Sequence, residues 1–403
     1  MSSISHGWAN YVGALGVTQI LGYGAIFYAF PLLAPFAAAE FEVSETRLYA
    51  VFSLGLFLGG IVASVAGPWL DRFGAPRVMA IGSACTAMLF TGLAFAPNVY
   101  IFSALVILLE ALSFLVLYDA AFAALAQGVP IGTRRAITRL TLIAGFASTL
   151  FWPLTGFLTE SIGWRMTYLV FAALHLALAL PLHLWLTRLT QRSISARQAD
   201  PSPLPAPDWP VVTGPRARPA FWLLGASFAL TGIVIAALGV HLVPSLLALG
   251  LGQHAYLIGM LMGPAQVMVR LVDATAWRSY HPLTVALISG MAVAVAVVAL
   301  QLAGQGMAFA IAFALIFGAG QGLASIVRGA VPLALFGPTG IGRRLGHLAA
   351  LRNVTAAAAP FAFALGTERL GLPLTLQLSL AIAILGFALL FGLHLLVRQA
   401  SDQ

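Results

Sequence analysis

The eleven residues GPWLDRFGAPR, from Gly67 to Arg77, stand between two long apolar runs of the sequence. They contain one aspartate, two arginines, two prolines and two glycines. Glycine and proline are typical of turns, and charged side chains favour water over an apolar interior. The stretch therefore predicts a short polar turn between two apolar helices.

The composition places those helices in a membrane. Hydrophobic residues make up 61% of the 403 residues and charged residues only 8%, whereas a soluble domain carries about 25% charged residues. So few charges cannot cover the surface of a soluble globule, so lipid must solvate much of the chain. The apolar runs are long and lack the alternation typical of barrel strands. We predict an all-α polytopic membrane protein.

About twelve apolar runs are long enough to cross a bilayer, since roughly twenty helical residues suffice. Their expected ranges are 9–36, 46–68, 77–96, 99–127, 136–159, 165–187, 220–248, 255–277, 283–303, 306–336, 347–369 and 374–397. The segment 188–219 carries seven prolines and five arginines and is expected to be an exposed linker. The predicted domains are a six-helix bundle at 1–187, a cytoplasmic linker at 188–219 and a second six-helix bundle at 220–403.

The basic residues predict the orientation of the helices. All 20 are arginines, and they gather in the loops of one side, which the positive-inside rule makes cytoplasmic. The arginines of that side are Arg72, Arg77, Arg134, Arg135, Arg139, Arg188, Arg192, Arg197, Arg216, Arg218, Arg278, Arg343, Arg344 and Arg398. Both termini are then cytoplasmic, and the first run lacks the features of a cleaved signal peptide. We expect the protein to lie in the plasma membrane, which in a bacterium is the inner membrane.

Several other classes of protein are disfavoured. Without lysine there is neither a Walker P-loop nor a Schiff-base nucleophile. The motifs H-E-x-x-H and G-x-S-x-G are absent, and the histidines lack metal-ligand spacing. The basic residues are spread over many short loops, which does not favour nucleic-acid binding. We therefore expect no enzyme activity, no cofactor, no metal and no obligate protein partner.

The opening stretch resembles the loop signature of the major facilitator superfamily, G-x-x-L-D-R-x-G-x-x-R, through Gly67, Asp71, Arg72, Gly74 and Arg77. Two sets of six helices joined by a polar linker resemble the same superfamily. The resemblance implies a secondary transporter whose two bundles rock around a central site, with this loop as a latch of the outward-facing state. Asp71 is expected either to cap the helix after the turn or to face a helix end in the other half.

Two further stretches resemble the monocarboxylate-porter branch and its bacterial relatives. They are YGAIFYAFPLLAPFAAAEFEVSET, Tyr23 to Thr46, and AGFASTLFWPLTGFLTESIGWR, Ala144 to Arg165. In that branch a lysine on the first helix and an Asp-x-x-x-Arg pair on the eighth handle the proton and the carboxylate. Here the lysine position falls near Phe27 and Tyr28, and the pair reads Gln266-x-x-x-Arg270, so the arginine is retained.

Arg270 lies within the expected eighth span, where a charge costs several kcal/mol and needs a reason. Its planar fork suits a carboxylate, with Gln266 one turn before it as a second polar contact. Asp273, three residues further on, can instead neutralise Arg270 on the same helix face. Anion binding and a structural ion pair are therefore both open.

The expected fourth span contains two acids, Glu110 and Asp119. Nine residues separate them, which on a continuous helix puts them on opposite faces. Either acid can carry a coupling proton, as can Asp273, or pair with an arginine of a neighbouring helix. Aromatic residues expected to line the binding cavity are Tyr23, Phe27, Tyr28, Tyr118 and Trp152.

Small residues recur every four positions on the expected second helix, at Gly55, Gly59, Ala63 and Gly67, and predict a ridge for close helix packing. Taken together, the sequence favours secondary active transport of a small organic solute, an organic anion such as a monocarboxylate, with protons as a coupling partner. The alternative is proton-coupled efflux of drugs or amphipathic metabolites.

Overall fold

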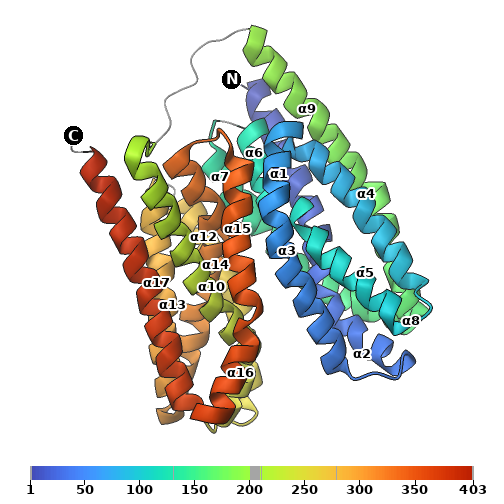
Figure 1. Cartoon of the computed structure of the whole chain (residues 1–403), viewed down its shortest axis with the longest axis vertical. Helices are drawn as coiled ribbons and strands as arrows, with labels where there is room; N and C mark the ends of the chain where they lie inside the picture. The colour runs from blue at the N-terminus through green and yellow to red at the C-terminus, as the bar shows by residue number, and fades with distance from the viewer. Residues whose placement is uncertain (1, 130, 200–208, 210, 278, 402–403) are drawn as a thin grey trace. The chain divides into compact units, whose positions relative to one another are not determined.

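The computed structural model describes residues 2–129, 131–199, 209, 211–277 and 279–401, and regular structure in these ranges is helical (Figure 1). The all-α fold class is thus confirmed. The chain divides into two compact units. Unit 1 contains Met1–Pro205 and Pro338–Ala350, and unit 2 contains Ala206–Gly337 and Leu351–Gln403. Arg278, together with residues 200–208 and 210 of the expected linker, lies outside the described residues.

The helices of unit 1 follow one another along the first half of the sequence. They are α1 (Ser2–Gly22), the π-helix η1 (Tyr23–Tyr28), α2 (Phe30–Glu40), α3 (Glu45–Phe73), α4 (Ala75–Ala94), α5 (Val99–Leu112), the 3-10 turn η2 (Ser113–Leu115), α6 (Tyr118–Gly128), α7 (Thr133–Ala144), α8 (Ala147–Leu174), the π-helix η3 (His175–Ala179) and α9 (Leu180–Ala199). The first residues of α15 (Ile341–Ala357) also belong to unit 1.

Unit 2 takes in the helices of the second half. They are the 3-10 turn η4 (Gly214–Arg216), α10 (Ala217–Ala248), α11 (His254–Met260), α12 (Met262–Thr275), α13 (Pro282–Leu302), the 3-10 turn η5 (Ala303–Gln305), α14 (Met307–Phe336), α16 (Ala359–Leu370) and α17 (Leu372–Ser401), together with the end of α15.

Eleven stretches of the described residues are long and apolar enough to cross a membrane. One of them, Thr133–Ser195, is 63 residues long, about three times what one crossing needs. Within it Gly163 has φ 80° and ψ 161°, a conformation that side-chain-bearing residues rarely adopt, and it breaks the helix there. This stretch therefore accounts for two of the predicted spans, and the chain has room for all twelve.

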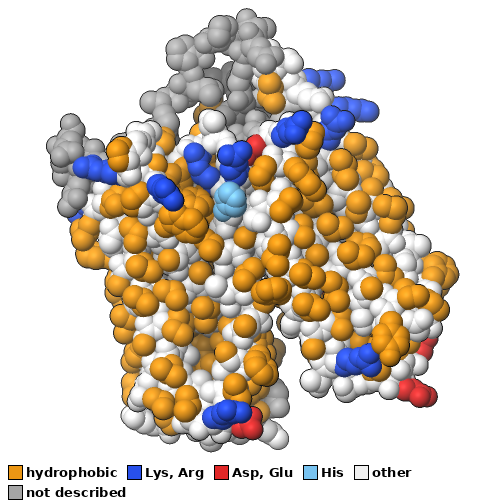
Figure 2. Space-filling view, viewed as in Figure 1, with side chains coloured by type: hydrophobic (Ala, Val, Ile, Leu, Met, Phe, Trp, Pro, Cys, Tyr) orange, Lys and Arg blue, Asp and Glu red, His pale blue; other side chains and the backbone are white. Residues whose placement is uncertain are grey.

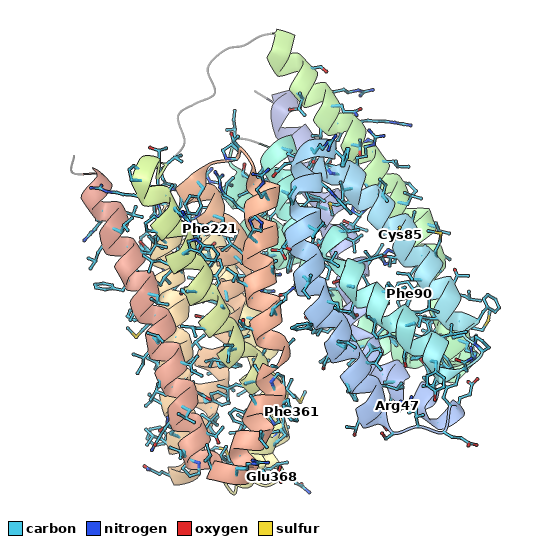
Figure 3. All side chains as sticks on the ribbon, in the orientation of Figure 1. Arg47, Cys85, Phe90, Phe221, Phe361 and Glu368 are labelled. Carbon is cyan, nitrogen blue, oxygen red and sulfur yellow. The ribbon has the colours of Figure 1, made fainter. Side chains whose placement is uncertain are left out.

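Polar side chains and glycines set the ends of the spans. The Asn98 side chain accepts hydrogen bonds from the backbone N–H of Tyr100 and Ile101, at 3.1 and 3.0 Å, and so caps α5. Ser44 caps α3 in the same way. Charged side chains lie toward the helix ends while hydrophobic ones cover the body of each unit, on the face in Figure 2. Arg47 lies near the start of α3 and Glu368 near the end of α16 (Figure 3).

Three expected helices differ in detail from the structure. The first span contains the π-helix η1 and continues to Glu40 instead of ending near residue 36. The fourth span is not one helix, because η2 and the turn after it interrupt the range 99–127. Helix α9 continues to Ala199, so residues 188–199 of the expected linker are helical.

Each unit has its own apolar core. Phe90 of α4 is fully buried in the core of unit 1 (Figure 3), and its ring centroid lies 5.8 Å from that of Tyr168 and 5.9 Å from that of Phe171. Phe313 and Phe317 of α14 are fully buried in unit 2. The side chains of these two clusters are hydrophobic, so buried polar side chains stand out against them.

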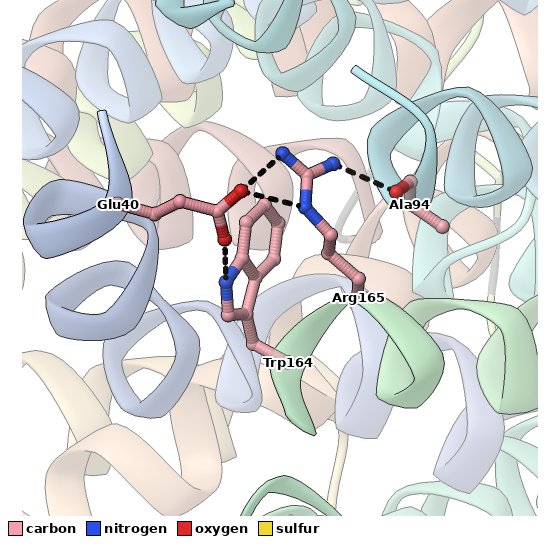
Figure 4. Close-up of polar contacts among 4 residues, drawn as sticks. All are labelled: Glu40, Ala94, Trp164 and Arg165. Carbon is pink, nitrogen blue, oxygen red and sulfur yellow. Dashed lines mark hydrogen bonds and ion pairs between the residues drawn. The ribbon is translucent and has the colours of Figure 1, made fainter. Parts of the chain in front are cut away.

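A polar clamp joins three helix ends of unit 1 (Figure 4). The Arg165 guanidinium donates two hydrogen bonds to Glu40 Oε1, at 3.0 and 2.7 Å, and one to the carbonyl of Ala94, at 2.8 Å. The indole N–H of Trp164 donates to Glu40 Oε2 at 2.8 Å. The guanidinium also lies over the Trp164 ring, 4.4 Å from its centroid. The clamp ties the ends of α2 and α4 to α8.

We expect Arg165→Gln to lower the stability of the protein by about 1 kcal/mol, because the pair is half-exposed but forked and backed by an aromatic ring. Thermal unfolding in detergent, followed by fluorescence, should show a midpoint lower by a few degrees. Glu160→Gln, an exposed acid on the same helix, is the matched control. If Arg165→Gln and Glu160→Gln unfold at the same temperature, the clamp does not stabilise the unit.

Candidate functional site

The turn Gly67–Arg77 joins α3 to α4, as the sequence predicted. Gly74 has φ 86° and so permits the reversal between the two helices. The side-chain amide of Gln127, from α6, donates to the carbonyl of Leu70 at 2.9 Å and accepts from the N–H of Ala75 at 2.7 Å. One amide thus satisfies the last turn of α3 and the first of α4, which fixes the turn on both sides.

Asp71 caps α15 rather than α4. Its two carboxylate oxygens accept hydrogen bonds from the backbone N–H groups of Gly342 and Arg343, both at 2.8 Å. The negative charge also suits the positive end of the helix dipole. Two roles were expected for Asp71: capping the helix after the turn, or facing the end of a helix distant in the sequence. The structure shows the second role.

A cavity of about 550 Å³ adjoins this cap within unit 1. Its lining residues are Pro68, Asp71, Arg72, Gly340, Arg343 and Arg344. The Arg72 guanidinium lies 5.2 Å from the centroid of the Phe73 ring, and Arg77 is exposed on α4. Among the signature residues, Asp71 and Gly67 both contact α15.

The small-residue ridge of α3 packs against two different neighbours. A Cβ atom at Gly67 would lie 2.6 Å from the carbonyl oxygen of Gly342 and 3.0 Å from the Cα of Gly346. Near the other end, Cβ atoms at Gly55 and Gly59 would overlap Glu110. The ridge therefore brings α15 close at one end and α5 close at the other.

The two acids of the fourth span lie on different helices, and this corrects the expectation that they sit on opposite faces of one helix. Glu110 is in α5, buried at 2% exposure beneath the glycine ridge. Asp119 is in the first turn of α6 and is 8% exposed. An acid in the first turn also stabilises its helix through the dipole. The break between them invalidates the angular argument, because that argument needs a continuous helix.

The aromatic candidates come together in unit 1. Tyr23, Phe27 and Tyr28 all lie on η1, Tyr118 on α6 and Trp152 on α8. The rings of Tyr23 and Tyr118 are 4.6 Å apart, and those of Tyr28 and Trp152 6.1 Å. These five residues, which we call the aromatic surface, thus share one region of the unit.

The arginine site is in unit 2. Arg270 on α12 is 7% exposed, and Asp273 on the same helix is 2% exposed. The Arg270 Nε donates to the carbonyl of Gly322, and Nη2 donates to Gln266 Oε1, each at 3.4 Å. Both of these hydrogen bonds are long.

Gln321 of α14 extends this site and was missed by the sequence analysis. Its Oε1 accepts a hydrogen bond from Gln266 Nε2 at 2.6 Å. Helices α12 and α14 approach this closely because Gly318 and Gly322 have no Cβ atoms. A Cβ atom at either position would lie only 2.5 Å or 2.9 Å, respectively, from a carbonyl oxygen of α12. The segment GAGQG, Gly318 to Gly322, was the available signal: three glycines around one amide in an apolar helix. Arg270, Gln266 and Gln321 form a chain of polar groups between α12 and α14.

A family model described as Major Facilitator Superfamily matches residues 15–360 of the chain. The match covers most of both units. The chain belongs to the Major Facilitator Superfamily. The chain is an integral membrane protein, and the superfamily to which it belongs is one of transporters and not of enzymes. The superfamily model does not distinguish the monocarboxylate-porter branch from others.

Two bacterial relatives match parts of the sequence. A gallate transporter of Pseudomonas putida is 32% identical over 177 residues, which are 43% of this chain and 38% of the relative. An uncharacterized MFS-type transporter, YcxA of Bacillus subtilis (strain 168), is 29% identical over 96 residues, 24% of this chain and 22% of the relative. The matched stretches span well under half the length of both relatives.

Two solved transporters of the superfamily share the fold over nearly the whole chain. The human organic anion transporter MFSD10 (TETRAN) has a TM-score of 0.74 at 15% identity, covering 95% of this chain and 99% of that one. The proton:xylose symporter XylE has a TM-score of 0.67 at 12% identity, covering 95% and 96%. At these identities the likeness concerns the fold of the superfamily.

Proposed function

We propose that this transporter moves a small organic anion, and that Arg270 binds the carboxylate. The burial of Arg270 within a membrane span carries the proposal. A guanidinium at that depth costs several kcal/mol, which a protein retains where the charge has a use. Gln266 and Gln321 support it, because Gln266 accepts a hydrogen bond from the guanidinium and donates one to Gln321, so that further polar groups gather beside Arg270.

Two similar proteins also support an organic anion as the substrate. One partial relative transports gallate and one structural neighbour transports organic anions. The finer assignment, a monocarboxylate as in the monocarboxylate-porter branch, rests on the retained arginine of the Gln266-x-x-x-Arg270 pattern.

The transport cycle that we propose is secondary and alternating. In it Gly67, Asp71, Arg72, Gly74 and Arg77 form a latch, and the capping bonds of Asp71 break and reform as α15 leaves and rejoins α3. Coupling to protons falls to Asp119, Glu110 or Asp273, all of them buried acids. We place the protein in the plasma membrane, in a bacterium the inner membrane, with both termini in the cytoplasm.

Proteoliposomes test the proposal directly. Purified protein is reconstituted with a pH-sensitive dye inside, and a panel of carboxylates, neutral sugars and cationic amphiphiles is added outside. We expect dye responses with carboxylates only. Efflux of cationic amphiphiles with no response to any carboxylate would overturn the anion assignment and favour drug efflux.

Gln321→Leu tests the support of the arginine site. The change leaves the Gln266 amide without its acceptor, and a half-buried donor without a partner costs roughly 1 kcal/mol. We expect KM for the transported anion to rise several-fold with kcat little changed. Gln321→Glu keeps an acceptor oxygen but adds a negative charge near Arg270, so it should also raise KM for the anion. Equal KM values for wild type and Gln321→Leu would show that Gln321 does not position Gln266.

A further inference from the structure

The cavity beside the Asp71 cap in unit 1 is strongly basic. Three of its lining residues are arginines and one is an aspartate, so the lining carries a net of two positive charges. The two hydrogen bonds that Asp71 accepts from α15 come from backbone N–H groups, so they engage the acid without using a guanidinium. A basic cavity of about 550 Å³ is suited to a ligand with negative charge.

The arginines reach this cavity from two helices. Arg72 comes from the last turn of α3, whereas Arg343 and Arg344 come from the first turn of α15. Arg72 and Arg343 are exposed, and Arg344 is half-buried. Nη1 of Arg344 donates to the carbonyl of Thr339 at 2.6 Å, which holds that side chain at the start of α15. An anion in the cavity can therefore be bound by guanidiniums from both helices.

The donors favour a phosphate group. Guanidiniums form paired, charge-assisted hydrogen bonds with phosphate oxygens. A phosphate is tetrahedral and presents its oxygens in several directions, so it can accept from guanidiniums of two helices at once. A carboxylate has only two oxygens, which lie in one plane, and is a poorer match to this arrangement.

The cavity lies at the level of the lipid headgroups. Its lining residues lie at the end of the apolar stretch Glu45–Phe73 and at the start of the stretch Ile341–Leu370, both of them long enough to cross a membrane. The ends of membrane spans lie where the hydrocarbon meets the headgroups. The phosphates closest to this depth are therefore those of phospholipids.

An exposed apolar stripe of α3 leads to the cavity. Four large hydrophobic side chains, each between 45% and 57% exposed, are spaced four residues apart and so share one face of the helix. They are Ile61, Val65, Trp69 and Phe73. Trp69 is two residues beyond Gly67, which places it about 200° around the helix from the face that contacts α15. Pro68 and Arg72, which line the cavity, are next to the stripe in sequence, so acyl chains on the stripe would place their headgroup at the cavity.

We propose that this cavity binds the phosphate headgroup of an anionic phospholipid, with its acyl chains lying along the stripe of α3. Arg72, Arg343 and Arg344 bind the phosphate, and Trp69 packs against the lipid near the membrane surface. The net positive charge favours an anionic lipid over a zwitterionic one, because it repels an ammonium group. The inference concerns the surrounding lipid and does not depend on the solute that is transported.

Binding of radiolabelled phosphatidylglycerol to the purified full chain in detergent, measured by scintillation proximity, tests the proposal. Unlabelled phosphatidylcholine with the same acyl chains should compete about tenfold more weakly than unlabelled phosphatidylglycerol. Arg72→Gln combined with Arg343→Gln should raise the Kd for phosphatidylglycerol about tenfold or more. Arg72→Lys combined with Arg343→Lys keeps both charges and should give an intermediate Kd. We expect these variants to fold, because both side chains are exposed and the Asp71 cap uses the backbone of Arg343.

A control matched in charge is Arg188→Gln combined with Arg192→Gln, which removes two exposed arginines from α9 of the same unit. This double variant should bind phosphatidylglycerol like wild type. An equal rise of the Kd in the two glutamine double variants would show a general attraction of a basic protein for anionic lipid and overturn the assignment to the cavity. Equal competition by phosphatidylcholine and phosphatidylglycerol in wild type would overturn the recognition of charge.

Inorganic phosphate separates a lipid site from a site for free phosphate. It should displace phosphatidylglycerol only at concentrations far above the Kd of the lipid, because it has no chains to contact the stripe. Trp69→Ala combined with Val65→Ala, which truncates the stripe but keeps the arginines, should raise the Kd for phosphatidylglycerol several-fold. Displacement by inorganic phosphate near the Kd of the lipid, together with an unchanged Kd in Trp69→Ala/Val65→Ala, would identify a site for soluble phosphate and overturn the lipid assignment.

Discussion

Arg270→Gln is expected to abolish carboxylate transport. Glutamine keeps a polar side chain of similar length but has neither the charge nor the forked donors of arginine. Two charge-assisted hydrogen bonds to a carboxylate are worth roughly 3–6 kcal/mol together, so affinity should fall about 100-fold or more. Arg270→Lys keeps the charge without the planar fork and should have an intermediate KM. Uptake of a labelled carboxylate into proteoliposomes measures both.

The matched control is Arg369→Gln, which removes an exposed arginine at the end of α16 in the same unit. It should transport like wild type. The expected loss must also occur at equal amounts of correctly folded protein, judged by size-exclusion elution and thermal unfolding. Arg270→Gln with an unchanged KM would leave only a structural role for this arginine.

Asp71→Ala is expected to release the start of α15 from α3. The two hydrogen bonds that Asp71 accepts from Gly342 and Arg343 are those of a helix cap, and their loss costs about 1–2 kcal/mol. That is enough to change a population ratio about tenfold. Asp71→Asn keeps one acceptor oxygen without the charge and should have a smaller effect. Transport should slow as the latch weakens.

Single-cysteine labelling can report this release, because Cys85 is the one native cysteine. In a Cys85→Ser background, Leu345→Cys places a thiol at a position of α15 that is 1% exposed. Asp71→Ala should speed its reaction with a water-soluble maleimide about tenfold, while Glu160→Gln, an exposed change on α8, should not. The same labelling rate with and without Asp71 would rule out the latch.

The sequence predicted what local patterns determine. Length and apolarity of the runs predicted the spans, and the polar residues of Gly67–Arg77 predicted the turn between α3 and α4. Gly163 was not singled out as a helix break, but the predicted fifth span ended at residue 159 and the sixth began at residue 165. The break therefore falls between these two spans. The glycine ridge of α3 followed from its spacing alone, since residues four apart share a helix face.

Features that depend on contacts distant in sequence were not predicted. The break between α5 and α6 lies in SFLVL, which has no proline or glycine to mark it. The π-helix η1 lies in an apolar run that is typical of an ordinary helix, and Phe151, distant in the sequence, packs on it at Gly24. Gln127 and Gln321 act through partners on other helices. A single sequence gives no sign of such partners, because each amide alone reads as a tolerated polar residue.

Counterflow most directly tests the claim that this protein is an organic anion transporter. Proteoliposomes are loaded with a high concentration of unlabelled benzoate, and trace labelled benzoate is added outside without any ion gradient. We expect transient accumulation of the label above equilibrium in wild type, and none in Arg270→Gln. Accumulation that is equal in the two proteins, or that occurs with neutral sugars and not with carboxylates, would contradict it.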